Sequence, residues 1–312
     1  MPIIPTPGAV PRLLQQRIHR ATVPDRWPRS DCSQGELQLL CYLTEHEYTG
    51  RGAIFDLGCG NGGSTFCLCH GLAHNPRPEA RAARVRAVDW FEAGDRKHSG
   101  HASRARFTSN IMEHADRVVV HDLDIRDFRW EGEPPALEIL FVDLAKEEDL
   151  FRAVADSFYG SFIPGRSLVV HQDFGRPRLS WLHYSTMFLL PWLEILDVID
   201  DTLVLRVERQ PERDVLNQLV SSSFDVRAKA HLVQEAARHF GGIRTHGVDY
   251  REILGLSEAY VWLRGGDPAG ALACLRGLAP TPEFERAFGD MLAEVRRVTA
   301  GYHGSCRQRG GG

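Results

Sequence analysis

The sequence predicts an α/β protein with a seven-stranded, mostly parallel sheet that ends in an antiparallel hairpin, followed by a C-terminal helical subdomain. Between residues 53 and 190, short apolar runs alternate with helix-type segments, which is the pattern of parallel strands joined by crossover helices. Two further apolar runs, 192–198 and 202–208, are joined by three residues, a link so short that these strands must be antiparallel. From about residue 211 the apolar spacing is helical throughout.

Length and composition narrow the class of protein. The chain of 312 residues has ordinary apolar content, enough for one large or two modest domains. Its formal net charge of -4 is not the positive charge that is typical of proteins that bind nucleic acid or an anionic membrane. No apolar run reaches membrane-spanning length, no signal-peptide pattern opens the chain, and the seven cysteines lack metal-type spacing. We therefore expect a cytoplasmic protein without a nucleic-acid or membrane partner.

Residues 1–50 are expected to form an N-terminal arm and a covering helix. Four prolines precede position 12, and two more follow by Pro28, so the start of the chain is extended. Ser33 and Glu36 have the spacing of a capping box. The helix that they open has one apolar face, made of Leu37, Leu40, Cys41, Thr44 and Tyr48.

The central domain is expected over residues 51–210. Its parallel strands are predicted at 53–57, 85–89, 117–121, 137–143 and 167–171, with helices near 64–72, 106–114 and 177–190.

The remaining residues, 211–312, are expected to form a helical extension used for packing or for a homodimer. Helices are predicted over 225–240, 249–263 and 268–278 and from Thr281 onward, and the glycine-rich tail 307–312 is expected to be disordered.

The most informative stretch is Ala53–Thr65, where a short strand leads into four glycines within six positions and then into a helix start. Glycine allows a sharp turn and a close approach to a ligand, and a helix N-terminus offers unpaired N–H groups. Gly58, Gly60 and Gly63 also satisfy the dinucleotide fingerprint G-x-G-x-x-G. The acid Asp56, two residues before the first glycine, would repel a pyrophosphate and attract a sulfonium cofactor with a free amino group.

The run Asp56-Leu-Gly58-Cys-Gly60-Asn-Gly62 resembles the first motif, D/E-x-G-x-G-x-G, of the class I S-adenosylmethionine-dependent methyltransferases. The resemblance covers about residues 35–210 and implies a Rossmann-like sheet and S-adenosyl-L-methionine as cofactor. The cofactor residues that it implies are Asp56, Gly58, Cys59, Gly60, Asn61, Gly62, Ser64, Thr65, Asp89, Trp90, Asp122 and Asp143.

Three of these positions have specific roles in the resemblance. Asp89 would bind the ribose hydroxyls, because a carboxylate accepts two hydrogen bonds from a vicinal diol. Trp90, or the neighbouring Phe91, would lie against the adenine. Asp122 would contact the adenine amino group, and Asp124 and Asp127 are close enough to compete for that role.

Chemistry is expected at the ends of the fourth and fifth strands, since strand C-termini in an open α/β sheet point into the active crevice. Asp143 and Lys146 follow the fourth strand, and Gln172 and Asp173 follow the fifth. This resembles metal-assisted small-molecule O-methyltransferases of the catechol and natural-product-sugar types. There a divalent ion lowers the pKa of an acceptor hydroxyl, and a lysine or an aspartate removes the proton.

The resemblance implies Mg²⁺ at Asp143, Gln172 and Asp173. Gln172 departs from a pair of acids, which hard cations prefer, so the sequence leaves the metal open. Without a metal, His171 or His183 is the candidate base, because histidine accepts a proton near neutral pH. The competing interpretation of His171 is a hydrogen-bonded core residue.

We therefore expect methylation of a hydroxyl on a small molecule, a sugar or an aromatic of secondary metabolism. One alternative is methylation of a nitrogen or of a peptide or protein side chain. Another is a partner subunit that binds S-adenosylmethionine without catalysis, and a third is a nicotinamide oxidoreductase.

Overall fold

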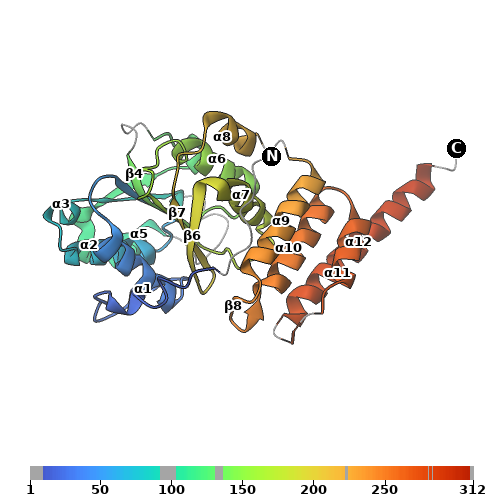
Figure 1. Cartoon of the computed structure of the whole chain (residues 1–312), viewed down its shortest axis with the longest axis horizontal. Coiled ribbons are helices and arrows are strands. Elements are labelled where there is room, and N and C mark those ends of the chain that lie inside the picture. Colours follow the sequence, from blue (N-terminus) through green and yellow to red (C-terminus); the bar gives the residue numbers. More distant parts are fainter. Residues whose placement is uncertain are drawn as a thin grey trace. The chain divides into compact units, whose positions relative to one another are not determined.

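The computed structural model of the chain describes residues 10–91, 103–130, 136–221, 224–279, 281–282 and 284–309 (Figure 1). By their contacts they divide into two compact units, which are described separately. The first is made of Val10–Asp173 and Trp192–Ser222, and the second contains Phe174–Pro191 and the helices after Ser223. The boundaries at residues 50 and 210 stay predictions.

The first unit is built on a seven-stranded sheet of order β3-β2-β1-β4-β5-β7-β6. The strands are β1 Ala53–Leu57, β2 Val85–Asp89, β3 Val118–Asp122, β4 Leu137–Val142, β5 Leu168–His171, β6 Leu193–Ile199 and β7 Thr202–Val207. The pairs among β1 to β5 are parallel, and β7 pairs antiparallel with β5 and β6. The predicted fold class is confirmed, and the strand order reverses between β1 and β4, where open α/β sheets bind ligands.

Helices cover both faces of this sheet. The unit contains 3-10 helix η1 Ile18–Arg20, α1 Gln34–Tyr42, π-helix η2 Leu43–Glu47, α2 Gly63–His74, α3 Pro78–Arg81, α5 Arg104–Asn110, η3 Met112–Arg117, η4 Ile125–Asp127, α6 Glu148–Phe158 and α8 Arg213–Val220. Because side chains alternate along a strand, Ile54 of β1 joins the core under α1 and α2. Its neighbour Phe55 lies on the other face, 4.7 Å in ring-centroid distance from Phe158 of α6.

The predicted capping box is confirmed at the start of α1. Ser33 Oγ accepts from the N–H of Glu36 at 3.1 Å, and Glu36 Oε2 accepts from the N–H of Ser33 at 2.7 Å. Glu36 also accepts a hydrogen bond of 2.7 Å from Thr202 Oγ1 on β7. The cap therefore joins the first helix to the antiparallel hairpin.

A buried carboxylate, Glu138 of β4, ties the entry of β1 to the sheet centre. It is 1% exposed and accepts from Thr49 N–H at 2.8 Å and Thr49 Oγ1 at 2.7 Å. It also accepts from the N–H groups of Arg51 at 2.9 Å and Gly52 at 3.1 Å. Four donors satisfy the charge, as a buried carboxylate requires.

The second unit is helical, with α7 Ser180–Leu189, α9 Val226–Phe240, α10 Tyr250–Arg264, α11 Pro268–Arg276 and α12 Glu285–Arg309; the short η5 Leu190–Trp192 follows α7. Helix α9 ends at Gly241-Gly242, as predicted. An unpredicted two-stranded hairpin, β8 Arg244–Thr245 and β9 Val248–Asp249, precedes α10. In the tail 307–312, expected to be disordered, residues 307–309 instead form the end of α12, and residues 310–312 lie outside the described residues.

Among the described residues, no helix combines the length and apolarity that crossing a membrane requires.

Candidate functional site

The glycine loop between β1 and α2 has the backbone conformation that its sequence predicts. Gly58, Gly60 and Gly62 have φ angles of 86°, 51° and 88°, values that side chains strongly disfavour. A Cβ on Gly58 would lie 2.8 Å from the backbone carbon of Asp143, so glycine allows the end of β1 to touch the end of β4. A Cβ on Gly60 would have its nearest neighbour 4.0 Å away. The loop is therefore tightly packed at Gly58 and open beside Gly60.

Asp56 is fully buried beneath the loop, at the end of β1. Its Oδ2 accepts hydrogen bonds from Ser64 Oγ at 2.8 Å and Thr65 Oγ1 at 2.5 Å, which fixes the first turn of α2. Its Oδ1 is buried without a partner. Desolvation raises the pKa of Asp56 to about 6, against the effect of the two hydroxyl donors. Most buried polar atoms have a hydrogen-bond partner, and Asp56 Oδ1 is an exception.

Asp89 lies beside the loop at the end of β2. Its Oδ2 accepts a 2.7 Å hydrogen bond from the N–H of Gly60, and burial raises its pKa. The next residue, Trp90, is 41% exposed, so its indole is open to a ligand. The structure thus joins Asp89 to Gly60, and the cofactor roles of Asp89 and Trp90 stay predictions.

Asp122, at the end of β3, is engaged with protein groups. It accepts from the N–H of Phe91 at 3.3 Å and pairs with Arg104 at 3.4 Å. The Arg104 guanidinium also lies over the Phe91 ring, 5.3 Å from its centroid. Asp122 therefore holds the Phe91 backbone and the Arg104 side chain.

A small cavity of about 40 Å³ lies over the loop. It is lined by Ser30, Asp31, Cys32, Gly58, Cys59, Gly60, Asn61, Gly63, Ser64 and Asp143. Asn61 Oδ1 is a second buried oxygen without a protein partner. The cavity joins most of the predicted loop residues to Asp143. The segment Ser30–Cys32 was not predicted to belong here, because nothing in its sequence distinguishes it from the rest of the arm.

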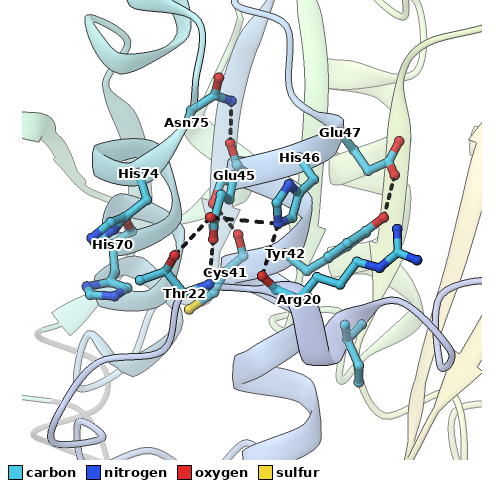
Figure 2. Close-up of polar contacts among 12 residues, drawn as sticks. Arg20, Thr22, Cys41, Tyr42, Glu45, His46, Glu47, His70, His74 and Asn75 are labelled. Atoms are coloured by element: carbon cyan, nitrogen blue, oxygen red, sulfur yellow. Dashed lines mark hydrogen bonds and ion pairs between the residues drawn. The ribbon is translucent and has the colours of Figure 1, made fainter.

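The arm that carries Ser30–Cys32 is held by polar contacts at residues 20–22 (Figure 2). Thr22 donates to Glu45 twice, from its N–H at 2.7 Å and from its hydroxyl at 2.9 Å. Arg20 O lies 3.3 Å from His46 Nε2. The contacts fix residues 20–22 against η2.

Between these contacts and the loop, the arm lines a larger cavity of about 620 Å³. Residues Pro24–Arg29 form one side, and α2 and the α5–η3 segment supply Phe66, His70, Ser109, Asn110 and Glu113. Asn110 links the two cavities, because its Nδ2 donates to the Asn61 carbonyl at 2.7 Å. No sequence pattern pointed to this cavity.

The four residues predicted at the ends of β4 and β5 do meet. Lys146 Nζ donates to Asp143 Oδ1 at 2.5 Å and to Gln172 Oε1 at 3.0 Å, and it also pairs with Asp173. Asp173 has a φ of 62°, a left-handed conformation that aspartate tolerates better than most residues. The three oxygens thus converge on an ammonium group.

Asp143 and Lys146 each change the pKa of the other. Burial raises the pKa of Asp143 to about 7, although the Lys146 ammonium opposes the rise. Desolvation acts to lower the pKa of Lys146, but the carboxylates of Asp143 and Asp173 outweigh it, so that pKa is raised. Lys146 is therefore a proton-bearing donor here, and Asp143 is the group whose protonation changes near neutral pH.

The two candidate histidine bases are both core residues. His171 is buried, with its Nε2 3.0 Å from the Tyr159 hydroxyl. His183 lies in the second unit, where its Nδ1 is 2.6 Å from Ser257 Oγ and its Nε2 is 2.7 Å from the Phe174 carbonyl oxygen. Burial lowers the pKa of each histidine to about 4. Neither lines the cavity over the loop.

Within the part of the chain that the structure describes, no three His, Cys, Asp or Glu side chains are grouped as metal ligands.

Neither the known protein families nor the curated proteins include a match to this chain. One similar solved structure comes from work on the conversion of a disulfide bond into a thioacetal group during echinomycin biosynthesis. It is 18% identical with a TM-score of 0.26, and the match covers 55% of this chain and 61% of that one. The chain thus matches less than two thirds of the length of that structure.

Proposed function

We propose that the chain is an S-adenosylmethionine-dependent methyltransferase that acts on a hydroxyl of a small molecule, a sugar or an aromatic. The observation that carries the proposal is the cavity over the glycine loop, which Gly58, Gly60 and Asn61 share with Asp143. The glycine loop and Asp143, whose pKa burial raises to about 7, lie together at the reversal of strand order, where open α/β sheets bind ligands. This supports a ligand site there.

The residues present fit this cofactor. The open space beside Gly60 and the orphaned oxygens of Asp56 and Asn61 suit a ligand that carries an amino group and a positive charge. Asp89 would bind the ribose hydroxyls while it keeps its bond to the Gly60 N–H. Trp90, 41% exposed, would cover the adenine.

These residues do not by themselves leave enough space for the cofactor. The cavity of about 40 Å³ is far smaller than the roughly 300 Å³ or more of a typical small-molecule site. Since Ser30–Cys32 form one wall of it, we propose that this end of the arm withdraws when the cofactor enters. The contacts of Thr22 with Glu45 would keep the rest of the arm attached.

When bound, S-adenosylmethionine supplies a methyl group already activated by its sulfonium sulfur. The chain's own task is then to align the acceptor, to exclude water and to remove the hydroxyl proton. Asp143 would accept that proton, since a base works best when its pKa is near the working pH. Lys146 would hold the Asp143 carboxylate in place through its 2.5 Å hydrogen bond.

The test is the release of S-adenosylhomocysteine with small-molecule acceptors, each hydroxyl compound paired with its amine analogue and with a peptide set. We expect release with hydroxyl acceptors, and loss of release in Asp143→Asn. Turnover confined to amines or peptides would contradict O-methylation. Tight binding of S-adenosylmethionine with no turnover of any acceptor would favour a non-catalytic binding subunit.

A further inference from the structure

The oxygens predicted to bind Mg²⁺ are arranged around a side chain of the protein itself. Asp143, Gln172 and Asp173 come from the ends of two neighbouring parallel strands, and each contacts Lys146 Nζ. An ammonium has three N–H donors and no acceptor. The three oxygens therefore satisfy the Lys146 head group completely.

A divalent ion at the same three oxygens would have to displace this ammonium. Mg²⁺ binds oxygens at about 2.0–2.1 Å, so it would occupy the position that Nζ holds 2.5 Å from Asp143 Oδ1. Two cations cannot share that position. Lys146 also neutralises one of the two carboxylates it contacts, which leaves at most one negative charge to attract a metal. Gln172 adds none.

The backbone holds this arrangement in place. Lys146 N–H donates to the Leu144 carbonyl at 2.7 Å, a tight turn directly after β4. Gln172 N–H donates to the Val142 carbonyl at 3.1 Å and extends the pairing of β4 with β5 beyond the strand end. Asp173 then adopts its left-handed conformation. Such a conformation is retained where the surroundings fix it.

We propose that the Lys146 ammonium is the resident cation of this site, and that it excludes the divalent ion that Asp143, Gln172 and Asp173 would otherwise bind. Lys146 is then a positioning residue for the two carboxylates. An acceptor molecule with a single hydroxyl would then suffice, because there is no metal for a second acceptor oxygen to chelate. The inference concerns cation binding, and it holds whether or not the glycine loop takes S-adenosylmethionine.

The experiment is a Mn²⁺ titration of the chelator-treated full chain, followed by the electron paramagnetic resonance signal of free Mn²⁺. Mn²⁺ suits the same oxygen ligands as Mg²⁺. Five proteins are compared: wild type, Lys146→Ala, Lys146→Arg, Asp143→Asn, and Lys146→Ala combined with Asp143→Asn. Removal of the lysine vacates the position of the cation, whereas arginine keeps the charge.

We expect wild type and Lys146→Arg to bind no Mn²⁺ at this site and Lys146→Ala to gain one site, at least about tenfold tighter than any wild-type binding. The double variant should lose that site. One equivalent bound by wild type and lost in Asp143→Asn would overturn the proposal, and this comparison does not depend on how the lysine variants fold. A folded Lys146→Ala that gains no site would overturn it as well.

Discussion

The Asp89 carboxylate accepts a hydrogen bond of 2.7 Å from the backbone N–H of Gly60. The bond joins the end of β2 to the middle of the glycine loop, at the glycine whose Cβ position is open. One carboxylate thus shapes the loop and borders the space beside it. Under the proposed function, the same group binds the cofactor ribose.

Replacement of Asp89 by alanine should weaken binding of S-adenosylhomocysteine by about tenfold or more, because hydrogen bonds to a charged group contribute roughly 1.5–3 kcal/mol. Calorimetric titration measures the change. Asp156→Ala is the matched control, since Asp156 is an exposed aspartate of α6. Equal affinities in the two variants would remove Asp89 from the cofactor site.

Asp143→Asn should reduce turnover by about a hundredfold or more, the usual contribution of a general base, and leave cofactor affinity within a few fold. In the wild type, the pKa of Asp143 is raised to about 7, and only the ionised form accepts a proton. The rate should therefore rise as the pH increases through about 7. A rate profile that is flat across this range, or a variant with full activity, would assign the proton to another group.

Asp56 should make the protein less stable as the pH rises. Its pKa is raised from 3.8 to about 6 in the folded chain, so between these values the folded state binds more protons than the unfolded state. The free energy of unfolding then falls with rising pH, by about 3 kcal/mol for a shift of this size.

Asp56→Asn cannot ionise and should lack this decline. Urea unfolding at about pH 3.5 and about pH 7 should show the variant gaining about 3 kcal/mol relative to wild type at the higher pH. Asp89 and Asp143 interact with Asp56, but acids without such an interaction titrate alike in both proteins. The difference therefore reports mainly on Asp56. A constant difference between the two proteins across this range would refute the raised pKa.

Glu138→Ala should destabilise the sheet unit by about 3 kcal/mol or more, because it leaves the partly buried N–H donors of Thr49, Arg51 and Gly52 without their acceptor. Glu113→Ala is the control, since Glu113 is exposed. Urea unfolding of the two variants measures the effect. Similar free energies of unfolding would show that water or another group replaces the lost acceptor.

The sequence was sufficient for the architecture because its signals are local. The strand run before Gly58 and the Ser33–Glu36 capping box are each contained in a few residues, and the structure confirms both. The two-residue strands β8 and β9 are too short to show a period of two. The four donors to Glu138 are 86 to 89 residues away along the chain, so no local pattern reveals them.

The sequence predicted which residues come together at the site better than it predicted their chemistry. Strand order alone brings Asp143, Gln172 and Asp173 to one edge of the sheet. Which cation lies among them depends on the reach of Lys146, and residue spacing does not encode this. The closure of the loop by Ser30–Cys32 likewise depends on where the arm packs.

The most direct test of the central claim is a calorimetric titration of the full chain with S-adenosylhomocysteine. We expect one site of micromolar affinity, weakened in Asp89→Ala and unchanged in Asp156→Ala. Absence of binding, together with tight binding of a nicotinamide dinucleotide, would contradict it and assign the glycine loop to another cofactor.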